Sequence, residues 1–189
     1  GTITRAADIC GDAGDANTFN STEGVLYAEV KYFENTLDSV ISISDGGNSN
    51  RILIGKKTDN KIQLYVQSTT TQVDITTSGT FSLDSYHKFA ISYKVNDFKL
   101  YIDGVLELSS TSGLVPVGLS QVDFYNPSGS SVFNGKVKQV LTFNTALLDT
   151  ELAALTLRYE NYQEWVTGEG LTWESPSCTN NNITELKNL

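Results

Sequence analysis

The sequence is poor in several residue types and has no long apolar run. Its 189 residues include no methionine, one histidine, two cysteines and three prolines. The longest apolar stretches, such as residues 24–28, are far below the ~20 residues that span a bilayer, so we expect no membrane insertion. Because methionine is absent even at position 1, we expect a module cut from, or processed out of, a longer protein.

Positive charge is also scarce. Lys and Arg number 13 against 22 Asp and Glu, which gives a net charge of −9, and no Lys/Arg-rich run offsets it. Nucleic acid and anionic membrane are therefore not expected as partners. With 39% hydrophobic and 19% charged residues, the composition is that of one globular domain.

The two cysteines, Cys10 and Cys178, lie near opposite ends of the chain. They have neither the close spacing of zinc ligands nor a Cys-x-x-Cys arrangement. A disulfide between them would tie the ends together and add about 4 to 5 kcal/mol in the chain-entropy model, in an oxidising compartment only. Two free buried thiols are the alternative, and the sequence leaves both open.

Most of the chain alternates β-branched or aromatic residues with polar ones, which predicts strands. Eleven are expected, at residues 3–9, 24–33, 39–44, 51–57, 61–67, 72–77, 86–95, 98–103, 105–109, 121–125 and 135–143. Asn96-Asp97 and Asp103-Gly104 predict tight turns of an antiparallel meander. The pattern indicates an all-β fold of two antiparallel sheets packed face to face.

The pattern becomes helical after residue 143. Asp149 is expected to cap a helix that carries Leu152 and Leu155 on one face, and residues 160–166 are expected to form a second helix. The last residues, 171–189, have little pattern and are expected to form an arm on the sandwich or toward a neighbouring chain. We therefore predict a domain at 1–157 and a C-terminal helical arm and tail at 158–189.

Five segments carry a family resemblance. Residues 133–147 and 151–155 combine a glycine, an alternating strand, an aromatic-x-x-Ala-Leu sequence and a short helix, and residues 86–105 form the expected central hairpin. Together they resemble laminin-G-like, concanavalin A-like jelly rolls, which implies a two-sheet jelly roll with short C-terminal helices. Residues 4–8 and 23–30 are similar to such domains in bacteriophage tail-fibre and other virion proteins.

Catalytic residues of that superfamily are missing. Its hydrolases carry two carboxylates in a Glu-x-Asp-x-x-Glu string, which this sequence lacks. Glu29 and Glu34 are five residues apart and fall on opposite faces of a regular strand, so we interpret them as solvated charges. The single histidine, His87, has no Gly-x-Ser-x-Gly partner, and we expect it at the surface or a sheet edge. We predict that the chain is not an enzyme.

Metal ligands are sparse. Legume lectins of similar fold hold paired metals with a Glu-x-Asp sequence followed by an aromatic residue and an Asn. Residues 121–126 here have a glutamine in place of the glutamate, and their asparagine comes one position earlier than in that pattern. We expect no paired-metal site and no other cofactor. The loop with Asp12 and Asp15 is the best candidate for calcium, although such a loop is more often a turn with internally bonded side chains.

Sugar binding needs a flat aromatic ring and polar side chains for hydroxyl groups. Candidates for ligand contact are Asp45, Asn48, Asn50, Arg51, Tyr125, Asn126 and Trp173. Each loop residue is also explained by a role in its own turn, and the two loops form one site only if they lie at the same end of the sandwich.

Together these patterns favour a non-catalytic glycan-binding adhesin or receptor-binding module of a phage fibre or virion protein. Its expected partners are a host cell-surface glycan and other virion chains, in a homo-oligomer that is a trimer if carried on a fibre. A virion assembly module without a ligand is one alternative. The other is a carbohydrate-binding module on a bacterial cell surface or in a secreted protein.

Overall fold

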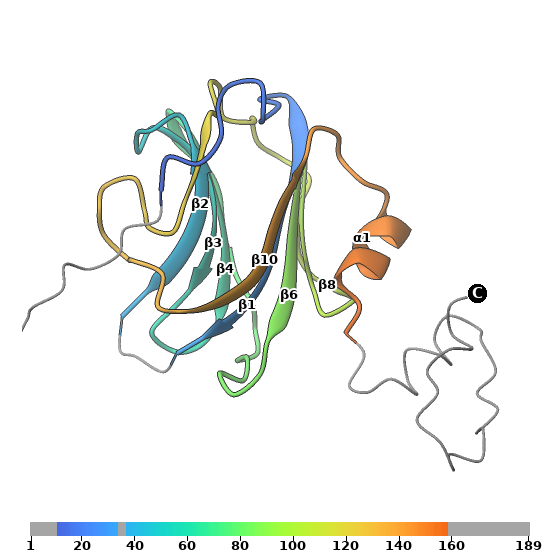
Figure 1. Cartoon of the computed structure of the whole chain (residues 1–189). Helices are drawn as coiled ribbons and strands as arrows, with labels where there is room; N and C mark the ends of the chain where they lie inside the picture. Colours follow the sequence, from blue (N-terminus) through green and yellow to red (C-terminus); the bar gives the residue numbers. More distant parts are fainter. Residues whose placement is uncertain (1–10, 34–36, 159–189) are drawn as a thin grey trace, which may run out of the picture. The chain divides into compact units, whose positions relative to one another are not determined.

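The computed structural model describes residues 11–33 and 37–158. Two five-stranded antiparallel sheets pack face to face (Figure 1). Sheet A runs in the order β5 (Thr70–Thr76), β4 (Ile62–Ser68), β3 (Asn50–Lys56), β2 (Ser39–Ser44) and β9 (Gln121–Asp123). Sheet B runs in the order β10 (Gly135–Phe143), β1 (Glu23–Tyr32), β6 (His87–Lys94), β7 (Asp97–Ile102) and β8 (Val105–Ser110). The predicted all-β sandwich is confirmed.

Several predictions lie outside the described residues. These are the strand at 3–9, the helix at 160–166, the tail at 171–189, and the side chains Cys10, Trp173 and Cys178. The division predicted between residues 157 and 158 falls at the end of the described part and stays a prediction. Within that part, no helix has the length and apolar character needed to cross a membrane.

The core lies between the sheets because each strand turns alternate side chains inward. The inward-facing residues of β1 include Leu26, Ala28 and Val30, and those of β6 include Phe89, Ile91 and Tyr93. Strands of sheet A contribute Ile41, Ile43, Ile52, Ile54, Ile62, Leu64 and Val66. The other residues of each strand therefore form the two outer faces of the sandwich.

Tight turns connect β6, β7 and β8. Asp103 and Gly104 have φ angles of 50° and 89°, as a hairpin turn with two left-handed residues requires, and Ile102 pairs with Val105 across it. The preceding turn falls one residue earlier than predicted. Lys94 pairs with Asp97, so the turn consists of Val95 and Asn96, and Asn96 takes the left-handed conformation.

Helix α1 (Asp149–Thr156) covers part of the outer face of sheet B (Figure 1). Leu152 is fully buried there, in a cluster with Val25, Tyr27, Ala90 and Tyr101. The predicted cap was wrong: Leu148 precedes the helix in an extended conformation, and its N–H donates to the Glu151 carboxylate at 2.7 Å. Asp149 is the first helical residue, and its carboxylate accepts from Lys99 at 2.7 Å.

Candidate functional site

The outer face of sheet A presents a set of polar and aromatic side chains on neighbouring strands. Because Ile52, Leu64 and Val66 point into the core, the residues that alternate with them point outward. The β-strand register aligns Arg51 with Gln67 and Thr71 in one row, and Tyr65 with Asp74 in the next. We call this set, with Gln63, the Arg51 face: Arg51, Gln63, Tyr65, Gln67, Thr71 and Asp74.

Tyr65 and Arg51 form the centre of this face. The Tyr65 hydroxyl donates to Gln67 Oε1 at 2.7 Å and lies 3.2 Å from Thr71 Oγ1, which fixes the ring. The Arg51 guanidinium carbon stands 5.0 Å from the ring centroid, within cation–π range. One guanidinium nitrogen donates to the Asn48 carbonyl, whereas Nε is buried and has no hydrogen-bond partner. The result is a preorganised pair of a planar cation and an aromatic ring on the outer face of sheet A.

The neighbouring turn uses its predicted site residues internally. Asp45 accepts from the backbone N–H of Gly47 at 2.9 Å and from the Asn50 amide at 2.8 Å. The Asn48 backbone carbonyl accepts a hydrogen bond from the Arg51 guanidinium, and the Asn48 residue is exposed. These residues shape the turn that begins β3, and through it they position Arg51 at the end of the Arg51 face.

Tyr125 and Asn126 lie elsewhere. Strand β9 runs antiparallel to β2, so the chain after Asp123 leads away from the Asp45 turn, and residues 124–134 continue beside β2, where the Val40 N–H donates to the Ser131 carbonyl (Figure 1). There the Ser42 hydroxyl donates to the Tyr125 carbonyl at 2.8 Å. The structure therefore does not bring the two predicted loops to one end of the sandwich.

A buried carboxylate organises the region around Tyr125. Asp123 has no exposed surface and accepts from the Asp12 N–H at 2.8 Å and the Gln121 amide at 2.9 Å. Burial, followed by the charges of Asp123 and Asp12, raises the pKa of the Tyr125 hydroxyl. The Gln121 amide also donates to the Asp12 carboxylate at 2.9 Å, so an uncharged donor links the two carboxylates.

Asp15, the other calcium candidate, belongs to a separate turn. Its carboxylate accepts from the Thr18 hydroxyl at 2.9 Å and from the backbone N–H of Asn17 at 2.9 Å. The Thr18 hydroxyl is the main cause that lowers the pKa of Asp15. Across the described ranges, no group of three or more His, Cys, Asp or Glu residues is arranged to hold a metal ion.

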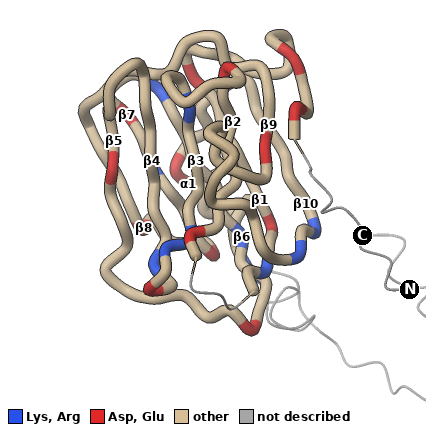
Figure 2. Tube along the Cα trace, turned by 90° about the vertical axis from the view of Figure 1, so that its left-hand side faces the viewer, with Lys and Arg blue, Asp and Glu red and all other residues tan. Residues whose placement is uncertain are grey.

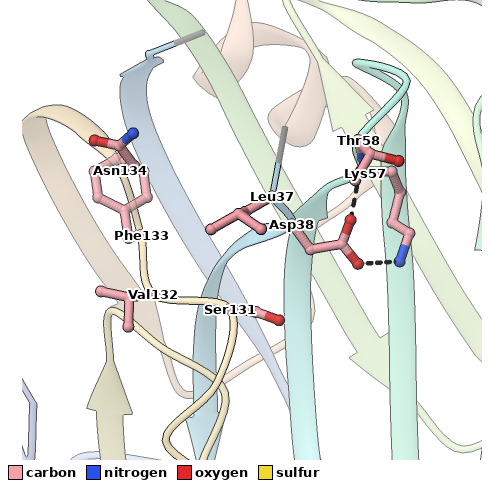
Figure 3. A pocket seen from close by; sticks show the side chains of 8 residues that line it. All are labelled: Leu37, Asp38, Lys57, Thr58, Ser131, Val132, Phe133 and Asn134. Carbon is pink, nitrogen blue, oxygen red and sulfur yellow. Dashed lines mark hydrogen bonds and ion pairs between the residues drawn. The ribbon is translucent and has the colours of Figure 1, made fainter. Parts of the chain in front are cut away.

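A pocket of about 760 Å³ opens at the opposite end of sheet A from the Asp45 turn (Figure 3). Its lining is Leu37, Asp38, Lys57, Thr58, Ser131, Val132, Phe133 and Asn134. Figure 3 shows Asp38 bonded to both Lys57 and the Thr58 N–H on one side, with Val132, Phe133 and Asn134 on the other. The pocket has room for a sugar, but its two charged groups already satisfy each other.

The position of His87 differs from the prediction. It is 7% exposed and begins β6, the central strand of sheet B, rather than lying at the surface or an edge. Its Nδ1 lies 2.5 Å from Asp103 Oδ2, and its Nε2 lies 3.4 Å from Ser85 Oγ, in the order of a Ser-His-Asp triad. However, Nε2 is closer to the Ser82 carbonyl, at 2.9 Å. Nε2 therefore lies nearer to the Ser82 carbonyl than to the Ser85 hydroxyl, and the close nucleophile–base contact of a triad is not formed.

The His87 cluster is instead structural. Asp103 also accepts from the Lys88 N–H at 2.9 Å and from Arg158 at 3.3 Å, just beyond the end of α1. The Gly104 N–H donates to Thr156 Oγ1 at 3.1 Å. These bonds fasten the end of α1 to the turn between β7 and β8.

Two packed antiparallel sheets with a helix on the outside of one form a β-sandwich. Residues 12–153 match the model of the concanavalin A-like lectin/glucanases superfamily, and the chain belongs to this family. No curated protein matches the chain in sequence.

Solved structures show the same fold. The CBM40 of the Ruminococcus gnavus IT-sialidase, bound to α2,3-sialyllactose, has 15% identity and a TM-score of 0.61, over 72% of this chain and 84% of that one. The NanB sialidase of Streptococcus pneumoniae has 12% identity and a TM-score of 0.65, over 75% of this chain and 25% of its own. A heptameric SAP-like pentraxin from Limulus polyphemus has 12% identity and a TM-score of 0.56, over 72% and 70%.

Sequence reasoning found Arg51 but missed the residues beside it. Gln63, Tyr65 and Gln67 alternate with the buried Ile62, Leu64 and Val66. That alternation identifies an outward-facing row with an aromatic residue at its centre, which is a signal for a ligand-binding sheet face. Its pairing with Arg51 needed the register between β3 and β4.

Proposed function

We propose that this chain is a non-catalytic carbohydrate-binding module and that the Arg51 face is its ligand contact. The observation that carries the proposal is the Arg51–Tyr65 pair, a guanidinium held 5.0 Å from an aromatic ring centroid on the outer face of sheet A. Sugar sites combine a planar apolar surface with a few polar groups of fixed orientation. Gln63, Thr71 and Asp74 supply such groups around the pair.

The proposed ligand is a glycan that carries an acidic sugar of the sialyllactose type. A guanidinium is planar and recognises carboxylates through paired hydrogen bonds. The similarity to a CBM40 bound to sialyllactose supports this choice. Because the chain as a whole carries a charge of −9, Arg51 has to provide local attraction against long-range repulsion.

The proposed setting is attachment to a host cell surface by a phage fibre or another virion protein, with the module displayed in several copies. It rests on the resemblance of residues 4–8 and 23–30 to such proteins. A homotrimer would raise weak single-site affinity through multivalency. A bacterial cell-surface or secreted carbohydrate-binding module is the second setting, and the similarity to the Ruminococcus and Streptococcus sialidases supports it.

The proposal is tested by titrating multimerised protein with sialylated and neutral glycans. The informative variant is Arg51→Gln, with Lys94→Gln as the control, because both remove one positive charge and Lys94 lies on sheet B. Losing a hydrogen bond to a charged group is worth about 1.5 to 3 kcal/mol, so R51Q should bind about 10- to 150-fold more weakly. K94Q should bind as the parent chain does.

Two results would overturn the proposal. One is an absence of saturable binding to every glycan tested, even by the multimer. The other is an R51Q variant that keeps parental affinity. Thermal unfolding of both variants separates a binding defect from a folding defect.

A further inference from the structure

Positive charge gathers on the outer face of sheet B beside α1, where Lys88 Nζ donates to the Leu157 carbonyl, just after the helix, at 2.8 Å. Lys31 on β1 lies directly opposite Lys136 on β10, and Glu29 lies opposite Lys88 on β6. Lys138 reaches the same face, because its Nζ lies 2.8 Å from Glu29 Oε1. We call Lys31, Lys88, Lys136 and Lys138 the lysine patch. Figure 2 shows Lys and Arg segments gathered near the β6 and β10 labels.

The pairing of Lys31 with Lys136 is unfavourable for folding. Directly opposed side chains on antiparallel strands are about 5 Å apart at Cβ, and like charges there are destabilising. Lys31 donates to a neutral group, the Asp84 carbonyl, at 2.6 Å. Sequences that break such a local rule tend to do so at functional sites.

A bulge adds to the patch. The register shifts between Glu29, opposite Gln139, and Val30, opposite Val137, which makes Lys138 the extra residue of β10. Bulges change the direction of side chains and are frequent beside binding sites. Here Lys138 Nζ stands 4.3 Å from the centroid of the Tyr86 ring, so an aromatic surface adjoins the charges.

Edge protection is the competing explanation. Strand β10 is the edge of sheet B, and edge strands often carry lysines that prevent pairing with another chain. This accounts for Lys136 and Lys138. It does not account for Lys31 and Lys88, because β1 and β6 are interior strands of the sheet.

We propose that the lysine patch is a second binding site, for a polysaccharide whose carboxylates repeat along the chain, such as a polyuronate. The patch extends from β10 to β6, two strand spacings or about 10 Å, which suits two successive charges of an extended polymer. The net charge of −9 disfavours larger anionic surfaces. The inference rests on the proposed function only in taking the ligand to be carbohydrate, since the patch and the Arg51 face lie on different sheets.

The test is affinity electrophoresis of the full chain in gels containing polygalacturonate, with neutral dextran as the reference polymer. The double variant Lys31→Gln, Lys136→Gln is compared with Lys61→Gln, Lys94→Gln, which has the same net charge. An exposed ion pair is worth up to about 1 kcal/mol, or about fivefold in affinity. We expect the patch variant to lose about tenfold or more toward polygalacturonate, less at high salt, and the control to lose little.

The outcomes separate the alternatives. Equal retardation of the two double variants, or equal retardation by polygalacturonate and dextran, overturns the inference. Self-association of the patch variant with unchanged polymer affinity also overturns it and assigns the lysines to edge protection. The R51Q variant distinguishes the two proposals, because it should lose sialylated glycans while it keeps its affinity for polygalacturonate.

Discussion

Truncation of Leu152 to alanine measures how firmly α1 is attached to sheet B. Leu152 is fully buried against Val25, Tyr27 and Tyr101. Removing three carbon groups forfeits about 2.4 kcal/mol of transfer free energy at ~0.8 per group, and the remaining cavity adds to this. An eight-residue surface helix can detach from the sheet while the rest of the domain stays folded. The substitution therefore cannot lower the free energy of unfolding by more than the free energy with which α1 binds to sheet B. We expect L152A to lower the free energy of unfolding by about 2 to 3 kcal/mol.

Urea unfolding and thermal unfolding, both followed by circular dichroism, provide the measurements. At about 2 to 4 °C per kcal/mol for a unit of this size, the melting temperature should fall by roughly 4 to 12 °C. Leu148→Ala is the matched control, since the same residue type there is 70% exposed and should change stability by less than ~0.5 kcal/mol. Equal effects of the two substitutions would show that α1 does not pack on the sheet as described.

Three further substitutions, one of them a control, test local features. Burial raises the pKa of Tyr93 to about 12, and a tyrosine in the unfolded chain ionises near 10, so stability should fall as the pH rises from about 10 to about 12. Ionisation of this tyrosine in the unfolded chain at pH 11 lowers the free energy of unfolding by about 1.4 kcal/mol relative to pH 8. The Tyr93→Phe variant should lack this loss, so its urea midpoint should fall less between pH 8 and pH 11 than that of the parent chain. Gly104→Ala should cost about 1 to 2 kcal/mol because φ is +89° and the new Cβ would lie 3.1 Å from Leu157, whereas Gly79→Ala, with open space, should be nearly neutral in the same unfolding assay.

Alternation along the chain was enough to predict the sandwich, because one face of each strand is buried. The hairpin at Asp103-Gly104 was equally accessible, since few residue pairs adopt two left-handed conformations in succession. Where a side chain is controlled by a distant partner, the prediction failed. His87 is buried because Asp103 and the Ser82 carbonyl satisfy its ring nitrogens, and neither contact follows from periodicity.

The candidate site shows the same division. Arg51 was identified from its turn, but its contact with Tyr65 depends on the pairing of β3 with β4. The separation of Tyr125 from Asp45 depends on β9 lying beside β2 and running in the opposite direction. Both the Arg51–Tyr65 contact and the separation of Tyr125 from Asp45 depend on which strands pair in the folded sheet. Local sequence patterns do not identify these pairings.

The hydrogen bond between Asp12 and Asp123 joins positions 111 residues apart in the sequence. The pairing of β1 with β10 likewise places Val25 opposite Phe143. Chains dominated by such distant pairings pay a large loop-closure entropy before the contacts form, and they fold in milliseconds to seconds rather than microseconds. The meander of β6, β7 and β8 needs only two tight turns, so we expect it to form before sheet B closes around it.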